Sequence, residues 1–566
     1  MVFSASTYEN FVSEKPSSQT RLFAPYQGPR DDFDLIIIGS GFGGGILADD
    51  LAERIGQNKR ILVLEAGSYL YPTHIYNVCR FPNSDVAKHF ACKTFSQDGD
   101  EHAENYIHER PQLNFGGRSI WWSGLIPQIQ PWELEFFPDR VRRDLQGGLL
   151  QKAGESMNES HSMGTIADQI VERFQRSPLA ADFTIRQTPR AVHQPYLQTT
   201  GAPRDTFFTE PTGVFNTAEL LINQVGLAPG VSHGDHRGLF LLLNKFAESI
   251  DHIPNSPLQY RVNTTDTLTS QPRSFLAKTV ILAGGSIESP KLLRRSPLFN
   301  QLSPAVQSMV GVGLTDHPTT SELSSPITHM GDLPIPRTAH AKIILYSKGR
   351  RGPSNETKYP FNVEININHE YWHLRENDPS ERSTNASGPS RIDFKFSFGN
   401  PVYGGNRMTQ PTGGDPYVPR MEFKNLSWLS HLAHERFPAL AGWRHGGDFD
   451  AIWGVLNDIS GKIFAEFGLD GRGVGPEGGA WFGRDGKGFG MGTVHHAACS
   501  LRMPFRWTYD GPWEGESVVD EDLQVRGMEG LYVCDMSVMP FSSAANPVRT
   551  LVALGLRLSE RLAGRV

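Results

Sequence analysis

The sequence is short of cysteine, of long apolar runs and of basic charge. Four cysteines in 566 residues, Cys79, Cys92, Cys499 and Cys534, are too few and too unevenly spaced for a disulfide framework. No apolar segment reaches the ~18 residues that a membrane-spanning helix needs. Lysine and arginine (54) are outnumbered by aspartate and glutamate (61), which gives a formal net charge of −7. We therefore expect neither a membrane segment nor a nucleic-acid partner.

Residues 1–30 lack the pattern of a secretory signal, which has a charged start followed by an apolar middle. We expect an extended arm there and a cytoplasmic, reduced protein. The chain length exceeds that of a single hydrophobic core, so more than one domain is expected. An apolar fraction of 38% and a charged fraction of 20% are typical of a globular protein.

Compact metal-ligand spacing is missing as well. The segment 71–109 has no clear period and reads as loop or lid. It contains His74, His89, His102 and His108, but these do not form a compact ligand pattern with cysteine or acidic residues that is typical of a zinc site. We expect no metal.

Glycine is abundant, with 57 residues, and one glycine-rich turn organises the chain. Leu35 to Ile38 form an apolar run that suits a strand buried on both faces of a parallel sheet. Gly39, Gly41 and Gly44 follow with the G-x-G-x-x-G spacing, and residues 46–53 carry an apolar helical face. In such a turn the first glycine allows the bend, the second admits a pyrophosphate, and the third lets the helix pack closely on the strand. The helix N-terminus would face the anion.

A second apolar run, Arg60 to Leu64, ends in Glu65, which lies 21 residues after Gly44. A carboxylate at this distance accepts the ribose hydroxyls of a dinucleotide. The alternative is a tight turn between packed elements, which leaves Glu65 without a purpose. The pattern predicts a dinucleotide site but does not separate NAD from FAD.

Three later segments repeat parts of this pattern. Residues 114–124 combine paired glycines with Ser119, Trp121 and Trp122, and indicate either a backbone close to a flat or anionic group or a glycine turn beside a core tryptophan pair. Residues 277–293 read as strand, glycines and helix, with Ser289 as the expected N-cap before Pro290. Residues 530–535 form another apolar run that ends in an acid.

Residues 320–488 differ in composition, with more glycine, proline and aromatic residues. The segments 342–346, 361–367 and 391–398 alternate with a period of two, which predicts antiparallel strands with one buried face. This indicates a second domain of another class. Near the C-terminus, Asn546 stands at an N-cap position and Pro547 in the first turn of a final helix.

Together these segments resemble the glucose-methanol-choline (GMC) oxidoreductases, which are FAD-binding flavoproteins that oxidise alcohols. The resemblance is discontinuous and spans residues 33–563. It rests on these pieces: Gly39 to Gly44 with Glu65-Ala66-Gly67, Gly116 to Ser119, Gly284 to Leu293, Val312 to Pro318, and the stretches around His496 and Asn546.

The resemblance implies an α/β fold: a Rossmann-like FAD-binding domain built from discontinuous segments, and an α+β substrate domain with an antiparallel sheet. The expected divisions are an arm at 1–30, FAD-binding parts at 31–130, 231–319 and 489–566, mixed substrate-domain or lid segments at 131–230, and the substrate domain at 320–488.

The resemblance also implies a catalytic pair. The family carries its base in His-x-x-Gly-Thr-x-Arg-Met, and the spacing to Arg502-Met503 matches His496, although a one-residue slip would select His495. Asn546 matches the second catalytic position, which the family fills with His or Asn. Cys499-Ser500 replaces the Gly-Thr of the motif, so the wall beside the base is expected to differ.

The implied cofactor is FAD. In the pyranose-oxidase-like branch a histidine that bonds covalently to FAD stands where this chain has Trp121, so we expect non-covalent FAD, with a histidine elsewhere as the open alternative. Asp535 is expected beside the ribityl and pyrophosphate region. The expected FAD-binding residues are Gly39, Gly41, Phe42, Gly43, Gly44, Glu65, Ala66, Gly116, Gly117, Ser119, Trp122, Ala283, Gly284, Asp535, Pro547 and Thr550.

The implied reaction is oxidation of a C–OH group of an alcohol, sugar or secondary metabolite, by hydride transfer to flavin N5 with a histidine base. The partners would be a small-molecule substrate and O2 or another electron acceptor. The alternative is a non-redox or light-driven use of the same fold, as in a lyase or photoenzyme. Substrate identity, oxidase or dehydrogenase action and oligomeric state are open from sequence.

Overall fold

The computed structural model describes most of the chain between residues 31 and 565. The described residues are 31–56, 58–69, 96–97, 109, 111–160, 164–193, 213–224, 238–317, 319–320, 323–349, 359, 361–368, 389–400, 402, 404–410, 414–422, 449–469, 489–490, 494–506, 513–514 and 517–565. The expected N-terminal arm and the four histidines between 71 and 109 lie outside them. No described helix is long and apolar enough to cross a membrane.

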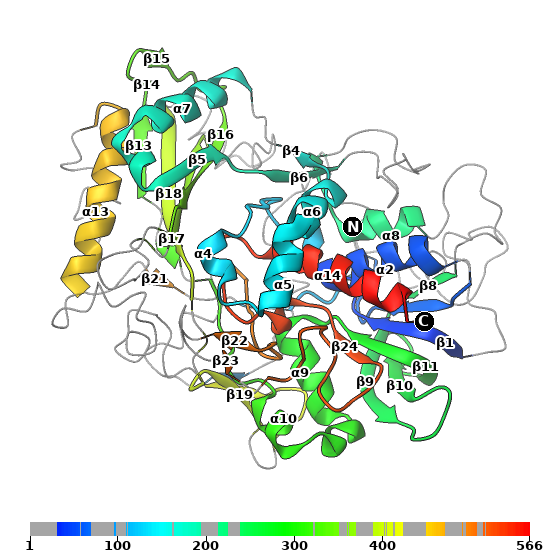
Figure 1. Cartoon of the computed structure of the whole chain (residues 1–566). Helices are drawn as coiled ribbons and strands as arrows, with labels where there is room; N and C mark the ends of the chain where they lie inside the picture. Colours follow the sequence, from blue (N-terminus) through cyan, green and yellow to red (C-terminus); the bar gives the residue numbers. More distant parts are fainter. Residues whose placement is uncertain are drawn as a thin grey trace.

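Two seven-stranded sheets form the two halves of the molecule (Figure 1). The first sheet contains β1 (Asp32–Ile38), β2 (Ile61–Leu64), β8 (Leu239–Leu242), β9 (Lys245–His252), β10 (Tyr260–Asp266), β11 (Pro272–Leu282) and β24 (Leu531–Val533). Its order is β8-β2-β1-β11-β10-β9, and β24 also pairs with β11. The pairings that join β8, β2, β1, β11 and β24 are parallel. β10 pairs antiparallel with β11 on one side and with β9 on the other. This architecture confirms the predicted α/β fold with a Rossmann-like half built from separated segments.

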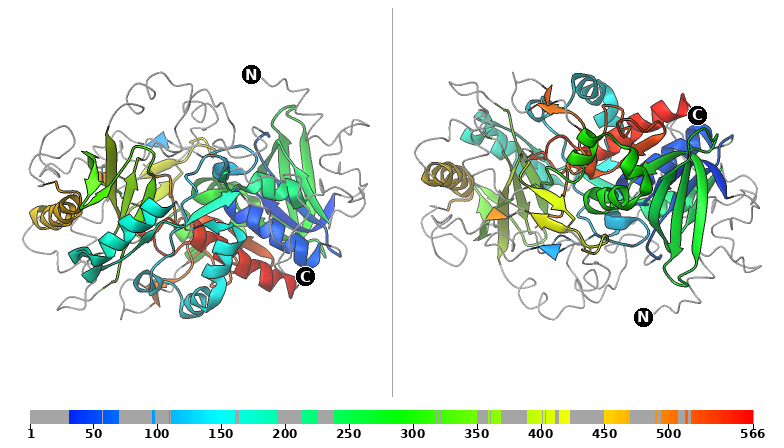
Figure 2. Two further views of the ribbon diagram at one scale, coloured as in Figure 1. Left: turned by 90° about the horizontal axis from the view of Figure 1, so that it is seen from above. Right: turned by 90° about the horizontal axis from the view of Figure 1, so that it is seen from below.

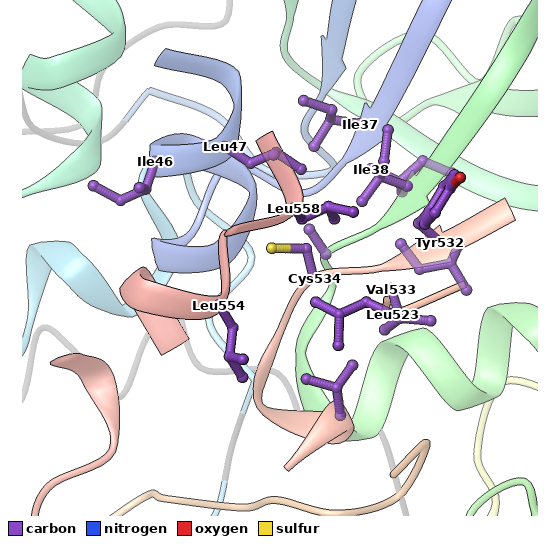
Figure 3. Close-up of a cluster of buried hydrophobic side chains, with 14 of the residues drawn as sticks. Ile37, Ile38, Ile46, Leu47, Leu523, Tyr532, Val533, Cys534, Leu554 and Leu558 are labelled. Carbon is purple, nitrogen blue, oxygen red and sulfur yellow. The ribbon is translucent and has the colours of Figure 1, made fainter. Parts of the chain in front are cut away.

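Helices complete this half. α2 (Phe42–Ile55) follows β1, and the last helix, α14 (Val548–Ala563), packs against α2 although about 500 residues separate them. Cys534, at the end of β24, lies among Ile46 and Leu47 of α2 and Leu554 and Leu558 of α14 (Figure 3). The first and last segments of the fold therefore share one hydrophobic core.

The second sheet contains β5 (Phe183–Gln187), β12 (Thr319–Thr320), β13 (Leu323–Ile327), β16 (Ala341–Ser347), β17 (Phe361–Ile367), β18 (Ser390–Phe398) and β21 (Phe489–Gly490). All of its pairings are antiparallel, as the alternating segments predict. One face carries phenylalanine, isoleucine, leucine and valine and packs on α7 (Thr165–Arg176) and α13 (Phe449–Glu466). Figure 2 shows these helices on the side of the sheet away from the first half.

The expectation of one buried face is wrong for the central strands. β16 and β17 are buried along their whole length, although Lys342, Asn362, Glu364 and Asn366 alternate with the apolar residues. Alternation predicts an exposed polar face only when nothing covers it. The polar face of this sheet is turned from α7 and α13 and is covered by other parts of the chain.

Shorter elements connect the two halves. The short strands are β3 (Ser96–Gln97), β4 (Glu159–Ser160), β6 (Arg190–His193), β7 (Gly213–Val214), β14 (His329–Met330), β15 (Leu333–Pro334), β19 (Arg407–Thr409), β20 (Arg420–Glu422), β22 (Phe505–Arg506) and β23 (Trp513–Glu514). The other helices are η3 (Gly117–Ile120), α4 (Pro131–Leu134), α5 (Asp139–Asp144), η4 (Leu145–Leu149), α6 (Leu150–Ser156), η5 (Pro178–Ala181), α8 (Thr217–Gln224), α9 (Gly285–Arg295), η6 (Pro297–Gln301), α10 (Pro304–Met309) and η10 (Met536–Val538).

The expected helix start at Ser289 and Pro290 is wrong. α9 begins four residues earlier, at Gly285, and Pro290 lies inside it. The Asp535 carboxylate accepts the Gly285 N–H at 2.9 Å, so an acid 250 residues away caps the helix. Pro290 cannot donate to the carbonyl of Ser286, four residues before it, and the Ser500 hydroxyl donates to that carbonyl instead at 2.6 Å.

Candidate active site

A cavity opens at the carboxyl ends of β1, β2, β11 and β24, where a doubly wound sheet binds ligands. It encloses about 1240 Å³ of open space, part of it continuous with solvent. Ten of the expected FAD-binding residues line it: Gly39, Gly41, Phe42, Gly43, Glu65, Ala66, Gly117, Ala283, Gly284 and Asp535. The other six are described but do not line it: Gly44, Gly116, Ser119, Trp122, Pro547 and Thr550.

The three glycines of the turn differ in what surrounds them. Gly39 has φ +112°, which glycine adopts without strain. A Cβ on Gly41 would meet nothing within 4 Å, whereas a Cβ on Gly44 would lie 2.0 Å from the Gly39 carbonyl oxygen. These surroundings agree with the three expected roles, because Gly41 leaves the approach to the α2 N-terminus open and Gly44 permits close packing.

Two buried carboxylates border the cavity. Glu65 accepts hydrogen bonds from the Ser40 N–H at 3.0 Å, the Ser40 hydroxyl at 2.6 Å and the Gly67 N–H at 2.9 Å. Asp535 accepts from Gly285 N–H and from the hydroxyls of Ser289 and Ser537. Burial raises the pKa of both carboxyls although these donors act against it. Each carboxylate thus joins separated segments around the cavity.

The two tryptophans after the paired glycines, Trp121 and Trp122, are fixed by hydrogen bonds to neighbouring segments. Trp121 Nε1 donates to Asn114 Oδ1 at 3.1 Å, and Trp122 Nε1 donates to the Phe215 carbonyl at 2.8 Å. Trp122 also lies edge-on to Phe42, with the ring centroids 4.6 Å apart. The structure agrees with a glycine turn beside a packed tryptophan pair, and Gly117 lines the cavity, while a contact of this backbone with a flat or anionic group stays a prediction.

A charged cluster that sequence reasoning missed lines the same cavity. Buried Glu109 accepts from Arg118 through both carboxylate oxygens, and its Oε2 lies 3.3 Å from Nδ1 of His495. Burial opposes ionisation, but Arg118 and His495 together lower the pKa of Glu109 to about 2. His495, with 44% of its side chain exposed, faces this cluster.

His496 faces a different neighbour. Its Nδ1 lies 3.1 Å from Nδ1 of His317, and its backbone N–H donates to Asp316 Oδ1 at 3.1 Å. Burial and then the nearby His317 lower the pKa of His496 well below its ordinary value. The imidazole is therefore neutral at pH 7 and able to accept a proton.

The polar face of the second sheet extends to this histidine. Glu364 and Lys395 lie opposite each other on β17 and β18, with Oε2 and Nζ 3.4 Å apart. Glu364 raises the pKa of His496, while Arg118 and Lys395 lower it.

Asn546 does not cap the last helix. α14 begins at Val548, and Pro547 occupies the cap position without a side-chain capping bond. Within the described part of the chain the buried Oδ1 of Asn546 accepts no hydrogen bond. An amide left with unused hydrogen-bonding capacity is not committed to holding the fold.

The loop that carries Asn546 is fixed by another buried acid, Glu133 of α4. One oxygen of Glu133 accepts from the Ala544 N–H, and the other accepts from the Gln130 N–H at 3.0 Å. Burial raises the pKa of Glu133 to about 7 against these donors. Sequence gave no signal for Glu133, whereas His317 stands in the 312–318 segment that carried the family resemblance without an assigned role.

The described residues contain no group of three or more His, Cys, Asp or Glu side chains that could hold a metal ion. Cys499 and Cys534 are free and buried. Cys499 adopts φ +73°, so the residue that replaces the motif glycine keeps the left-handed backbone that glycine favours.

The comparisons with known proteins agree with this geometry. Residues 487–555, which include His496 and Asn546, match the family model described as GMC oxidoreductase. Over this segment the predicted resemblance to the GMC oxidoreductases is confirmed. It is 24% identical to the oxygen-dependent choline dehydrogenase of Staphylococcus xylosus, over 95% of this chain and 96% of that protein. Over a 70-residue stretch, 12% of this chain and 10% of that protein, it is 39% identical to oxidoreductase cicC of Emericella nidulans (strain FGSC A4).

Solved structures show the same fold. A formate oxidase variant from Aspergillus oryzae RIB40 has a TM-score of 0.60 at 16% identity, covering 94% of this chain and 98% of that one. Pyridoxine 4-oxidase from Mesorbium loti has a TM-score of 0.54 at 15% identity, covering 94% and 99%. The family-model match and the choline dehydrogenase relative support the predicted FAD cofactor and an oxidoreductase function.

The residues present fit FAD. The open side of Gly41 and the start of α2 would hold the pyrophosphate, and Glu65 borders the cavity where a ribose would lie. Trp121, in the position expected for a covalent histidine, donates to Asn114, and non-covalent attachment of FAD stays a prediction.

Proposed function

We propose that this GMC oxidoreductase oxidises a C–OH group of a small molecule, with His496 as the base and Asn546 as the partner of the reacting oxygen. FAD, when bound, supplies the hydride acceptor. The observation that carries the proposal is a neutral imidazole, His496, between His495 and Ala497, which both line the cofactor cavity.

In this proposal His496, Asn546 and the polar groups on β17 and β18 each have a separate role. His496 accepts the hydroxyl proton, and its lowered pKa keeps it in the accepting form. Asn546 contacts the substrate with its side-chain amide, whose Oδ1 has no partner in the described part of the chain, and its Nδ2–H donates to the substrate oxygen as the proton leaves. The polar groups on β17 and β18, with Glu364 and Lys395 nearest His496, bind the rest of the substrate in place of water.

The test is anaerobic mixing of the holoenzyme with a panel of alcohols, polyols and sugars while the flavin absorbance is followed. Bleaching of the flavin by at least one substrate is expected, and readmission of air then separates an oxidase from a dehydrogenase. The variant His496→Ala should slow bleaching about 10²–10⁴-fold. Product formation with an unchanged flavin spectrum would replace the proposal by a lyase, and wild-type bleaching by His496→Ala would remove His496 from the role of base.

Non-covalent attachment of FAD is part of the same proposal. Acid precipitation of the holoenzyme should leave all of the flavin in the supernatant. Flavin retained on the precipitated protein would point to a bond through another residue, and His495 would be the first candidate because it lines the cavity.

A further inference from the structure

Among the described residues, His317 makes a single polar side-chain contact, and this contact is to the proposed base. Its Nδ1 lies 3.1 Å from Nδ1 of His496, with the ring centroids 5.2 Å apart. The side chain is 1% exposed, and in the described part of the chain its Nε2 has no hydrogen-bond partner. An unsatisfied buried imidazole nitrogen destabilises the fold, so packing alone does not explain a histidine here.

The backbone holds the two rings in register. Asp316 Oδ1 accepts the N–H of His317 at 2.6 Å and that of His496 at 3.1 Å. Beside this carboxylate, Thr315 and Ala498 exchange two backbone hydrogen bonds of 3.1 and 2.9 Å. Hydrogen bonds between residues 315–317 and residues 496–498 therefore set the distance between the two Nδ1 atoms.

The short Nδ1–Nδ1 distance couples the tautomers of the two rings. A hydrogen bond between two neutral imidazoles holds one proton, so one Nδ1 donates and the other accepts. If His496 accepted at Nδ1, its own proton would be on Nε2, and that atom would be unable to take a proton from a substrate. If His317 accepts, Nε2 of His496 is free.

We propose that His317 is a positioning residue that accepts the Nδ1 proton of His496 and thereby leaves Nε2 of His496 as the basic atom. The inference rests on the proposed function of His496. In the proton-transfer step the O–H bond of the substrate breaks and an Nε2–H bond forms on His496, while the Nδ1 proton stays between the two rings. The imidazolium so formed donates a charge-assisted hydrogen bond to His317.

The charges that face the pair come from three other elements. Lys395 of β18 acts on both rings, Glu364 of β17 and Arg118 of η3 act on His496, and Asp316 holds both backbone N–H groups. Burial and Lys395 lower the pKa of His317 to about 3, so His317 stays neutral and keeps a lone pair on Nδ1.

Two matched substitutions test the proposal. Asparagine places an acceptor oxygen close to the position of His Nδ1, whereas leucine has a similar shape and no acceptor. In holoenzyme, His317→Leu should lower the rate of flavin reduction about 10²–10⁴-fold with little change in KM, and His317→Asn should stay within about tenfold of wild type. The thermal midpoint of His317→Leu should stay close to that of wild type, because the unsatisfied Nε2 of His317 is removed while Nδ1 of His496 loses its acceptor.

A substrate-free measurement keeps this test separate from that of the proposed function. In wild-type enzyme with ¹⁵N-labelled histidine, the NMR shifts of His496, assigned by comparison with His496→Ala, should show a protonated Nδ1 and a bare Nε2. A protonated Nε2 on His496 would overturn the proposal whether or not any alcohol reduces the flavin. Equal flavin-reduction rates in the leucine and asparagine variants would also overturn it.

Discussion

The Ser500 hydroxyl donates to the Ser286 carbonyl, which is the carbonyl that Pro290 leaves without an intrahelical donor in α9. Both serines are buried, and Ser286 returns a hydrogen bond of 2.6 Å from its hydroxyl to the Ala497 carbonyl. The helix that borders the cofactor cavity and the segment that carries His496 are therefore joined by two reciprocal hydrogen bonds.

Ser500→Ala removes one of these bonds and leaves the Ser286 carbonyl unsatisfied, so we expect a loss of about 1–3 kcal/mol in unfolding free energy. Ser500→Thr is the matched control, because it restores the residue of the family motif and keeps the hydroxyl. Urea unfolding of both variants measures the difference. A threonine variant as unstable as the alanine variant would show that packing, and not the hydrogen bond, matters at this position.

Glu133 predicts a pH dependence of stability. Its pKa is about 7 in the folded protein and 4.5 in the unfolded chain, so the folded state binds more protons between these values. Stability from this group is fully present below pH 4.5 and is lost as the pH rises through 7, by on the order of 3 kcal/mol. Glu133→Gln should flatten this part of the profile of thermal midpoint against pH.

The exposed carboxylate of Glu172 provides the control for this measurement, with 61% of its side chain in solvent. Glu172→Gln should leave the profile unchanged. An unaltered slope in Glu133→Gln would mean that Glu133 is ionised in the folded protein at pH 6.

Substitutions at Gly41 and Gly43 test cofactor binding and folding separately. A Cβ at Gly41 would project into open space, whereas a Cβ at Gly43 would lie 1.8 Å from the Cys534 carbonyl oxygen. Gly41→Ala should fold with the thermal midpoint of wild-type apoprotein but retain little FAD. Gly43→Ala should lower the thermal midpoint of the apoprotein itself. Full FAD content in Gly41→Ala would move the pyrophosphate away from this turn.

The lowered pKa of His496 sets the acid limb of the reaction. Because protonation of the base occurs only well below pH 6.5, kcat/KM should stay level as the pH falls through 6.5 and decline at lower pH. Stopped-flow flavin reduction between pH 5 and 8 measures this profile. A decline centred at pH 6.5 would show that a base with the lowered pKa of His496 does not limit the reaction.

Glu364 and Lys395 should move this acid limb in opposite directions. Lys395→Met removes a cation and raises the pKa of His496, and Glu364→Gln removes an anion and lowers it. The double variant should return toward wild type, because the two charges oppose each other. Shifts of the same sign in both single variants would place the pair outside electrostatic reach of His496.

The sequence predicted those parts of the fold that neighbouring residues determine. The run from Leu35 through the glycine turn to Glu65 was recognisable because strand, turn and helix signals stand next to each other, and ten expected FAD-binding residues line one cavity. The helix start at Ser289 failed because the true cap, Asp535, is distant in sequence. The prediction that Asn546 caps the last helix was also wrong. The local sequence pattern does not show whether a side chain faces its own helix or a functional site.

The residues around His496 show the other limit. His317, Glu109 and Glu133 become candidates only when their neighbours in space are known, because each lies more than 170 residues from a residue of the site that it contacts. The sequence also did not predict that the polar face of β17 is buried, because the alternation of polar and apolar residues alone predicts an exposed polar face.

The pairing of β24 with β11 and of α14 with α2 has a consequence for synthesis of the chain. α2 packs against α14, which leaves the ribosome some 500 residues later, whereas β1 pairs with the earlier strands β2 and β11. At translation rates of about 5–20 residues per second, α2 remains without α14 for about 25–100 s. The core around Cys534 therefore forms only after translation is nearly complete.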